Sequence, residues 1–328
     1  MSNLEAAPGE LVCQDRPGTA PGVTVLAPRD VPLGGPRAMR VRRTLPQRQR
    51  SLIGAWCFAD HYGPQDVAGT GGMDVGPHPH TGLQTASWLF SGEIEHRDSL
   101  GSHAMVRPGE LNLMTGGHGI AHSEVSTPET TTLHGVQLWI ALPDEHRHTA
   151  RDFRHHAPPR LALPGASARV FLGSLAGATS PVPTFTPLLG AELVLDPGAR
   201  LALDVDPAFE HGVLQDIGAI TVAGTALATG DLAYLAPGAR RVELANTGDS
   251  PTRVLVLGGT PFTEEIVMWW NFVGRSHDEI AAFREAWEAE SEQFGDVEGY
   301  AGTPGRLPAP ALPRARLTPR RNPTEGHR

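Results

Sequence analysis

Two short stretches of this sequence, Pro77-His78-Pro79-His80 and His122-Ser123-Glu124, each place two metal-binding side chains at positions i and i+2. Such positions point to the same side of an extended strand. Two pairs of this kind can close around one ion and offer it three imidazoles and one carboxylate. That donor set suits iron, manganese, copper, nickel or zinc. Histidines are also crowded here, since twelve of the fifteen lie between His61 and His156. The alternative is a His-rich segment of unrelated surface and core histidines.

The sequence around these stretches is typical of short β-strands separated by turns. Val136, Leu138 and Ile140 alternate along one predicted strand, and residues 85–90, followed by Ser91-Gly92 and residues 93–98, predict a hairpin-like unit. The content of 38 glycines and 30 prolines, with only 19% charged residues, favours a turn-rich all-β protein. Strands at this spacing indicate a small barrel or jelly roll, which closes its own edges.

The length of 328 residues corresponds to roughly two domains. We expect a flexible leader over residues 1–22, a barrel with the metal site over 23–150, a linker over 151–168, and a second barrel plus a short helix over 169–295, without a metal. The helix is predicted by the capping box Ser276-x-x-Glu279, followed by apolar residues at helical spacing. Residues 296–328 are rich in proline and arginine and predict a disordered tail.

Composition excludes several classes of function. The net charge of −9 argues against binding nucleic acid, which requires a basic surface. All 27 basic residues are arginines, so mechanisms that require a lysine are excluded. The two cysteines, Cys13 and Cys57, form neither a disulfide framework nor a thiolate metal site. No signal peptide and no apolar run of bilayer length is visible, so we expect a cytoplasmic protein that does not bind membranes.

Five ordered motifs stand out in the first half of the chain. They are Asp60-His61-Tyr62-Gly63-Pro64, Pro77-His78-Pro79-His80-Thr81-Gly82, Pro108-Gly109-Glu110, Gly116-Gly117-His118-Gly119-Ile120-Ala121-His122-Ser123-Glu124 and Leu133-His134-Gly135-Val136-Gln137-Leu138-Trp139. Together they resemble the motifs of the pirins, two-barrel members of the cupin superfamily. The later segment around Gly258-Gly259-Thr260-Pro261-Phe262 also looks like the pirin C-terminal signature, and the resemblance covers about residues 23 to 295.

The resemblance implies one divalent metal ion in the first barrel, bound by His78, His80, His122 and Glu124. Cupins generally place a carboxylate ligand four residues after the second histidine of His-x-His, but here that position is Gln84, which leaves Glu124 as the anionic ligand. His118 stands where pirins commonly carry arginine. We therefore consider His118, together with Gln84 and His61, as a candidate for the pocket or for support of the ligands.

Bacterial pirins resemble quercetin 2,3-dioxygenases, so the resemblance implies a ring-cleaving dioxygenase acting on flavonols or related phenolics with dioxygen. We expect the protein to be a monomer. Fe(2+) is the expected metal, with Mn, Ni, Cu or Zn as alternatives. Glu124 would be the catalytic proton acceptor. The main alternative is a non-enzymatic metal- or redox-sensing protein that binds a protein partner, as a transcriptional co-regulator does. A zinc-type cupin isomerase is disfavoured by the absence of lysine and by Gln84.

Overall fold

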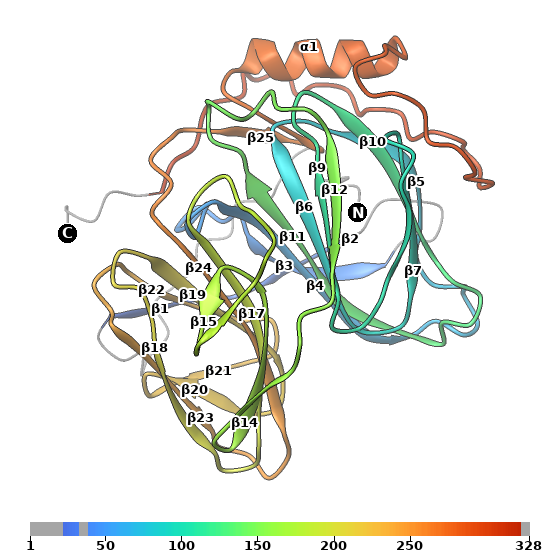
Figure 1. Ribbon diagram of the computed structural model, residues 1–328. Coiled ribbons are helices and arrows are strands. Elements are labelled where there is room, and N and C mark those ends of the chain that lie inside the picture. The colour runs from blue at the N-terminus through green and yellow to red at the C-terminus, as the bar shows by residue number, and fades with distance from the viewer. Residues whose placement is uncertain (1–21, 33–38, 323–328) are drawn as a thin grey trace.

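The computed structural model describes residues 22–32 and 39–322, and they form two β-barrels packed side by side with a short helix at one end (Figure 1). The predicted all-β fold with two barrels and a C-terminal helix is confirmed. The predicted leader lies, apart from Gly22, outside the described residues. Within the described part of the chain, no helix is long and apolar enough to cross a membrane.

The first barrel consists of two facing antiparallel sheets. Its larger sheet has seven strands in the spatial order β12 (Asp152–His156), β9 (Leu111–Thr115), β6 (Leu83–Ser91), β11 (Thr132–Ala141), β4 (Trp56–Asp66), β3 (Arg40–Leu45) and β2 (Arg29–Pro32). Its smaller sheet has the order β5 (Asp74–His80), β10 (Ile120–Ser126), β7 (Ile94–Asp98) and β8 (His103–Val106).

The second barrel repeats this plan. Its larger sheet has the order β1 (Val23–Leu26), β22 (Leu232–Leu235), β19 (Glu210–Ile217), β24 (Thr252–Gly259), β17 (Leu188–Leu195), β14 (Ala166–Leu172) and β13 (Leu161–Leu163). Its smaller sheet has the order β18 (Arg200–Asp204), β23 (Arg241–Asn246), β20 (Ile220–Val222) and β21 (Thr225–Leu227). The hairpin of β15 (Ser174–Leu175) and β16 (Ala178–Thr179) follows β14.

Turn chemistry explains where the strands end. Between β17 and β18, Asp196-Pro197-Gly198 forms a tight turn in which Gly198 has a φ of +69° and the Ala199 amide donates to the Asp196 carbonyl. Proline presets the φ of the first central position and glycine accepts the positive φ of the second. The hairpin predicted for residues 85–98 is wrong, however. Strand β6 pairs with β9 and β11, whereas β7 pairs with β8 and β10, so the chain crosses from one sheet to the other at Gly92 (φ +86°).

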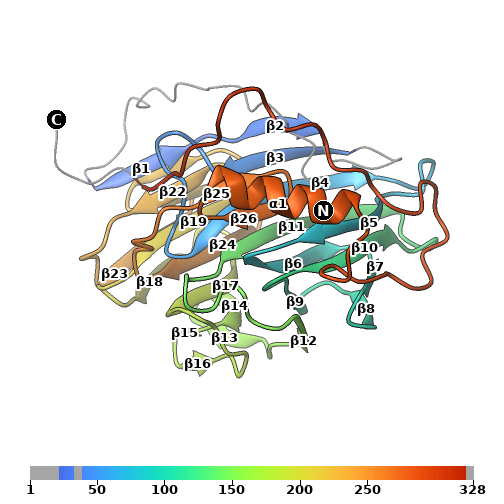
Figure 2. The ribbon, with the colours of Figure 1, turned by 90° about the horizontal axis from the view of Figure 1, so that it is seen from above.

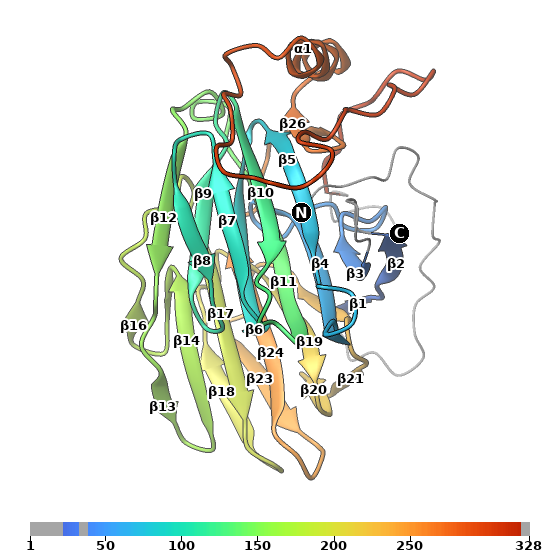
Figure 3. The same cartoon turned by 90° about the vertical axis from the view of Figure 1, so that its right-hand side faces the viewer.

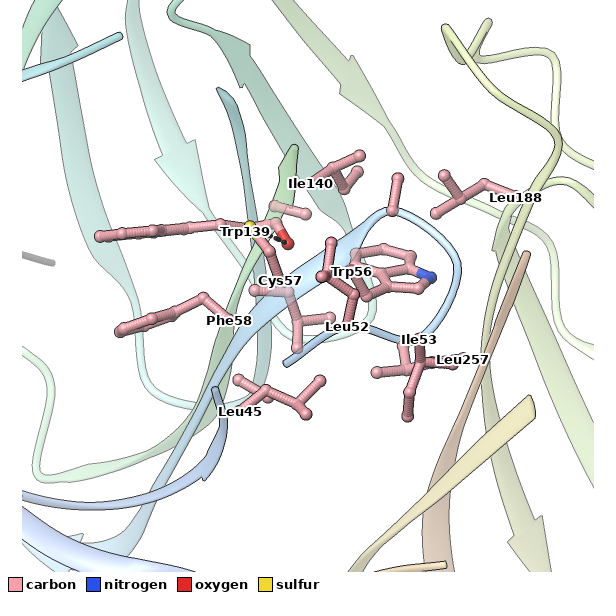
Figure 4. Packing of buried hydrophobic residues seen from close by; sticks show 14 of the residues in the cluster. Leu45, Leu52, Ile53, Trp56, Cys57, Phe58, Trp139, Ile140, Leu188 and Leu257 are labelled. Atoms are coloured by element: carbon pink, nitrogen blue, oxygen red, sulfur yellow. Dashed lines mark hydrogen bonds between the residues drawn. The ribbon is translucent and has the colours of Figure 1, made fainter. Parts of the chain in front are cut away.

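The two barrels share a hydrophobic core between their larger sheets, which includes Trp56 and Leu257 (Figure 4). The Trp56 indole nitrogen donates to the backbone carbonyls of Leu189 and Gly258 in the second barrel. Trp88 of the first barrel donates from its indole nitrogen to the Glu192 carboxylate at 2.9 Å. These buried donors satisfy their hydrogen bonds across the interface, which ties the barrels together.

Two predicted domain boundaries need correction. Residues 23–26, expected in the first barrel, form β1 and pair with β22 of the second barrel. The linker expected over 151–168 is largely strand: β12 extends the larger sheet of the first barrel by pairing with β9, and β13 pairs with β14. The charged and proline-rich composition suggested a linker, but edge strands commonly carry exposed polar residues because one side of the strand faces solvent.

The helix α1 (His277–Glu288) begins at the predicted N-cap, where the Ser276 hydroxyl accepts from the Glu279 amide. Its buried face is Ile280, Phe283 and Trp287. The preceding hairpin of β25 (Val267–Trp269) and β26 (Phe272–Gly274) also belongs to this apolar cluster. Figures 1 and 3 show α1 at the end of the first barrel near β5 and β10, and Figure 2 looks down on it.

The disordered tail predicted for residues 296–328 is not what the structure has over residues 296–322. The Leu307 amide donates to the Pro77 carbonyl, its own carbonyl accepts from the Trp287 indole, and its side chain is buried. Tyr300 bonds the Asp74 carboxylate at 2.8 Å. The tail has too little apolar surface for a core of its own, but it uses the surface that the barrel and α1 provide. Residues 323–328 lie outside the described part of the chain.

Candidate metal centre

The four predicted ligands come from two neighbouring strands of the smaller sheet. His78 and His80 lie on β5, and His122 and Glu124 lie on β10, which pairs with β5 so that His122 stands directly opposite His78. The register shifts between His122 and Glu124 at a β-bulge. A bulge re-aims the side chain that follows it. All four side chains are buried in the first barrel.

The imidazoles converge at short distances. Ligand nitrogens of His78, His80 and His122 lie within 4.8 Å of one another, and the Nε2 atoms of His80 and His122 are 3.1 Å apart. Two nitrogens bound to one metal at about 2.1 Å and at right angles would be about 3.0 Å apart. The separation is therefore that of neighbouring ligands on a single ion.

Backbone carbonyls fix which nitrogen of each ring is free. The His78 Nδ1 lies 2.9 Å from the Gly76 carbonyl oxygen, and the His80 Nδ1 lies 3.1 Å from that of Asn271. A carbonyl only accepts, so each Nδ1 carries the proton and each Nε2 presents its lone pair. The His78 Nε2 is buried and has no hydrogen-bond partner. A buried acceptor without a partner is costly, and a metal ion would satisfy it.

Burial keeps these imidazoles in the form that binds metal. Desolvation lowers the pKa of His78, His80 and His122 well below the ordinary histidine value. The mutual repulsion of neighbouring imidazolium charges acts in the same direction for His78 and His122. The three rings are therefore neutral at physiological pH, as coordination requires. Three neutral imidazoles, a nearby carboxylate and a His78 nitrogen without a partner fit a divalent metal.

Behind His122 lies a chain of hydrogen bonds. The Nδ1 atoms of His122 and His96 are 3.3 Å apart, and the His96 Nε2 lies 3.1 Å from the Asp98 carboxylate. Burial opposes ionisation of Asp98, but bonds from His96 and from the Ser102 amide outweigh it and lower the pKa of that carboxyl. The chain holds the His122 ring with Nε2 toward His80. His96 and Asp98 alternate with Glu95 and Arg97 along β7, which turns His96 and Asp98 to the same side of the strand.

His96 could also be counted among the ligands, because it lies within ligand distance of His122 and Glu124. Its contact with His122 is through Nδ1, however, on the opposite side of the ring from the nitrogen that approaches His80. We therefore assign His96 to the support of His122 and retain Glu124 as the carboxylate ligand candidate.

The wall that faces Glu124 belongs to the larger sheet. The Ser87 hydroxyl on β6 lies 3.3 Å from a Glu124 carboxylate oxygen and donates at 2.8 Å to the Gln137 side-chain oxygen on β11. Ser87 and Gln137 are direct cross-strand neighbours, so both point into the first barrel. Neither residue was singled out from the sequence, because their approach to Glu124 depends on how the two sheets face each other.

Two of the three further candidates lie away from the ligands. Gln84 shares the outward face of β6 with Trp88, which contacts the second barrel, and it donates to the Thr115 hydroxyl at 2.9 Å. His118 is half-buried in the loop between β9 and β10, where its Nδ1 lies 3.2 Å from the Thr149 carbonyl oxygen. We assign neither of them to the metal centre.

His61, the third candidate, belongs to a second cluster between the barrels. The Nε2 atoms of His61 and His134 both approach one oxygen of Asp216, at 2.6 and 2.5 Å. The guanidinium groups of Arg42 and Arg253 contact the other nitrogens of the two rings, at 3.0 and 3.4 Å. His61 faces the second barrel because it alternates with Asp60 and Tyr62 along β4. The positive charges of the two arginines disfavour a metal ion at this place. We therefore interpret the cluster as a hydrogen-bonded link between the two barrels.

Comparison with known proteins agrees with this architecture. Residues 38–140 match the model of the pirin domain and residues 190–294 match that of the pirin C-terminal cupin domain. A protein of Pseudomonas aeruginosa named "Putative quercetin 2,3-dioxygenase" is 47% identical over 87% of this chain and 89% of its own length. The chain belongs to the pirin family.

Other pirin relatives support the same assignment. A pirin-like protein of Caulobacter vibrioides is 36% identical over 79% of this chain and 91% of its own length. Among solved structures, a quercetin 2,3-dioxygenase from Acinetobacter baumannii superimposes with a TM-score of 0.84 at 39% identity, covering 90% of this chain and 98% of the other. The resemblance therefore extends over both barrels of this pirin.

Proposed function

We propose that this pirin is a metal-dependent dioxygenase of the quercetin 2,3-dioxygenase type, acting on flavonols or related phenolics. The observation that carries the proposal is the convergence of His78, His80 and His122 inside one barrel, with the buried Glu124 carboxylate within ligand distance of His122. The names carried by the relatives from Pseudomonas aeruginosa and Acinetobacter baumannii support the same reaction class. Fold alone would not, because cupin barrels serve many chemistries.

The residues that would hold the metal are His78, His80, His122 and Glu124, with iron as the first choice. A bound divalent metal would supply the Lewis acidity that makes a substrate hydroxyl easier to deprotonate, and a redox partner for dioxygen. The three neutral imidazoles leave Glu124 as the anionic group of the set. Imidazole and carboxylate are also the ligand types of non-haem iron sites that use dioxygen.

Glu124 is the proposed acceptor of the proton of the substrate hydroxyl. Its carboxylate is buried beside the imidazoles, and an acceptor must lie within hydrogen-bond reach of the proton that it takes. The Ser87 hydroxyl lies 3.3 Å from that carboxylate, on the facing wall of the barrel. Glu124 is buried inside the barrel, and electrostatic interactions are stronger where solvent access is low.

Oxygen consumption tests this proposal. The protein is purified without oxygen, its metal content is measured by elemental analysis, and oxygen uptake is followed with quercetin, other flavonols and simple catechols. We expect about one metal ion per chain and uptake that depends on both the metal and the phenolic. A metal-replete protein that consumes no oxygen with any of these compounds would refute the dioxygenase assignment.

A further inference from the structure

The inner face of β11 carries two buried hydrogen-bond donors that lack partners. The side-chain nitrogen of Gln137 and the indole nitrogen of Trp139 are both buried, and neither has a hydrogen-bond partner. The two residues are at positions i and i+2, so they lie on the same side of the strand. That side faces the metal ligands, because Ser87, the cross-strand neighbour of Gln137, contacts Glu124.

Local hydrogen bonds do not satisfy Gln137. The Ser87 hydroxyl has one hydrogen, and it donates that hydrogen to the Gln137 side-chain oxygen at 2.8 Å. The amide nitrogen of Gln137 remains as a donor on the wall opposite Glu124. Buried polar groups are nearly all paired in folded proteins, so an unpaired donor beside a metal site points to a ligand that supplies the acceptor.

The neighbouring aromatic rings define the shape of such a ligand. Trp139 stacks on Phe58 with ring centroids 4.0 Å apart and planes inclined by 13°. The same indole meets the His80 ring edge-on at 5.2 Å, so the aromatic pair lies next to a candidate metal ligand. In Figure 4 the rings of Phe58 and Trp139 lie side by side and point away from Leu188 and Leu257, which belong to the second barrel. Flat apolar surface next to hydrogen-bond donors suits a planar aromatic compound that carries acceptor oxygens.

We propose that Gln137, together with Trp139, determines substrate specificity by binding a second oxygen of the substrate, a carbonyl oxygen adjacent to the hydroxyl that the metal would bind. The preferred class is then a planar aromatic with neighbouring hydroxyl and carbonyl groups, rather than a simple phenol or catechol. This inference rests on the proposed function, because it assumes that the substrate binds beside Glu124. It adds the residues that distinguish one class of phenolic from another.

Two bicyclic probes separate the contribution of the carbonyl. The probe 3-hydroxychromone has a hydroxyl and an adjacent carbonyl, whereas 2-naphthol has similar size and a hydroxyl only. Dissociation constants are measured without oxygen on the metal-loaded full-length protein, for wild type, Gln137→Leu and Trp139→Phe. Gln84→Leu is the matched control, since Gln84 is an equally buried glutamine that lies on the outward face of β6.

We expect wild type to bind 3-hydroxychromone more tightly than 2-naphthol. Gln137→Leu should raise the dissociation constant of 3-hydroxychromone about tenfold, which is the effect of losing one hydrogen bond. The dissociation constant of 2-naphthol and the metal content should not change. Trp139→Phe keeps an aromatic ring but removes the indole N–H, so the dissociation constant of 3-hydroxychromone should rise several-fold. Gln84→Leu should change the binding of neither probe. If Gln137→Leu does not fold, Gln137→Met, an unbranched replacement of similar length, takes its place.

Two results would overturn the inference. One is a wild type that binds 3-hydroxychromone no more tightly than 2-naphthol. The other is a Gln137 variant in which the binding of both probes is weakened equally or the binding of neither is weakened. Failure of the dioxygenase proposal is distinguishable from these results. A protein that binds 3-hydroxychromone through Gln137 but consumes no oxygen with any flavonol would refute the reaction and leave the recognition of the carbonyl intact.

Discussion

The Nδ1 of His80 lies 3.1 Å from the backbone carbonyl oxygen of Asn271, 191 residues further along the chain. Asn271 lies between β25 and β26, in the segment that follows the second barrel. The same hairpin contacts the chain again directly after β5, where Thr81 forms a bridge with Phe272. A ligand of the first barrel is therefore held in orientation by the C-terminal segment, which implies that the metal centre depends on parts of the chain far from its own motif.

Removing the C-terminal segment after Gly299 should destabilise the protein. The truncation removes Leu307, whose side chain is buried against the barrel and whose backbone bonds Pro77 and Trp287. We expect the free energy of unfolding to fall by about 2–4 kcal/mol, measured by chemical denaturation. Leu307→Ala should reproduce part of the loss. Arg316→Ala, which removes an exposed ion pair with Asp278, should have little effect. A truncated protein as stable as the full chain would contradict the docking of this segment.

Substituting the candidate ligands should remove the metal. The double variant His78→Ala/His122→Ala deletes two imidazoles that converge on one point, so elemental analysis should find most of the metal gone. His118→Ala is the control, because His118 bonds the Thr149 carbonyl outside the cluster, and it should retain full occupancy. Full occupancy in the double variant would show that the metal binds elsewhere.

His96 should affect metal affinity without binding the metal. The variant His96→Leu removes the partner of the His122 Nδ1 and frees that ring to rotate. Groups that orient a metal ligand typically change affinity 10- to 100-fold, so competition with a chelator should show a loss of about that size. His103→Leu, a more exposed histidine of the adjacent strand β8, serves as the matched control. Equal affinities for the two variants would argue against the supporting role of His96.

His211 should make stability depend on pH. It is buried in the second barrel, neither ring nitrogen has a partner, and burial lowers its pKa to about 4. Below about pH 6.5 the His211 imidazole binds a proton in the unfolded chain but stays neutral in the folded chain. The free energy of unfolding therefore decreases as the pH falls from 6.5 toward 4. The variant His211→Leu should therefore gain stability relative to wild type as the pH is lowered through this range. Denaturation curves measured from pH 7 to 4.5 check this, and a difference independent of pH would refute it.

The parts that could be predicted from sequence are those with local periodicity. His78 and His80 share a strand face because of their spacing alone, and the helix follows from the cap at Ser276 and the stripe after it. The alternating runs likewise predicted an all-β chain with two barrels.

The parts that could not be predicted depend on register and on contacts between distant segments. Gln137 lies opposite Glu124 because the two sheets of the first barrel face each other. His61 contacts Asp216 because the two barrels pack together. Gln84 was considered near the metal because of its distance in sequence from His80, but its place on β6 turns it outward. The tail composition gave no sign of docking, since Leu307 uses a surface made by other residues.

Oxygen uptake by wild type and by Glu124→Gln, each with its metal content determined, tests the central claim most directly. Glutamine has nearly the size of glutamate but cannot accept the proton of the substrate hydroxyl. The metal-replete wild type should consume oxygen with quercetin or a related flavonol. The variant, compared at equal bound metal, should lose at least about 100-fold in rate, the usual contribution of a general base. Equal rates would refute the role of Glu124. No uptake by the metal-replete wild type with any flavonol or catechol would contradict the dioxygenase assignment and favour a metal- or redox-sensing protein.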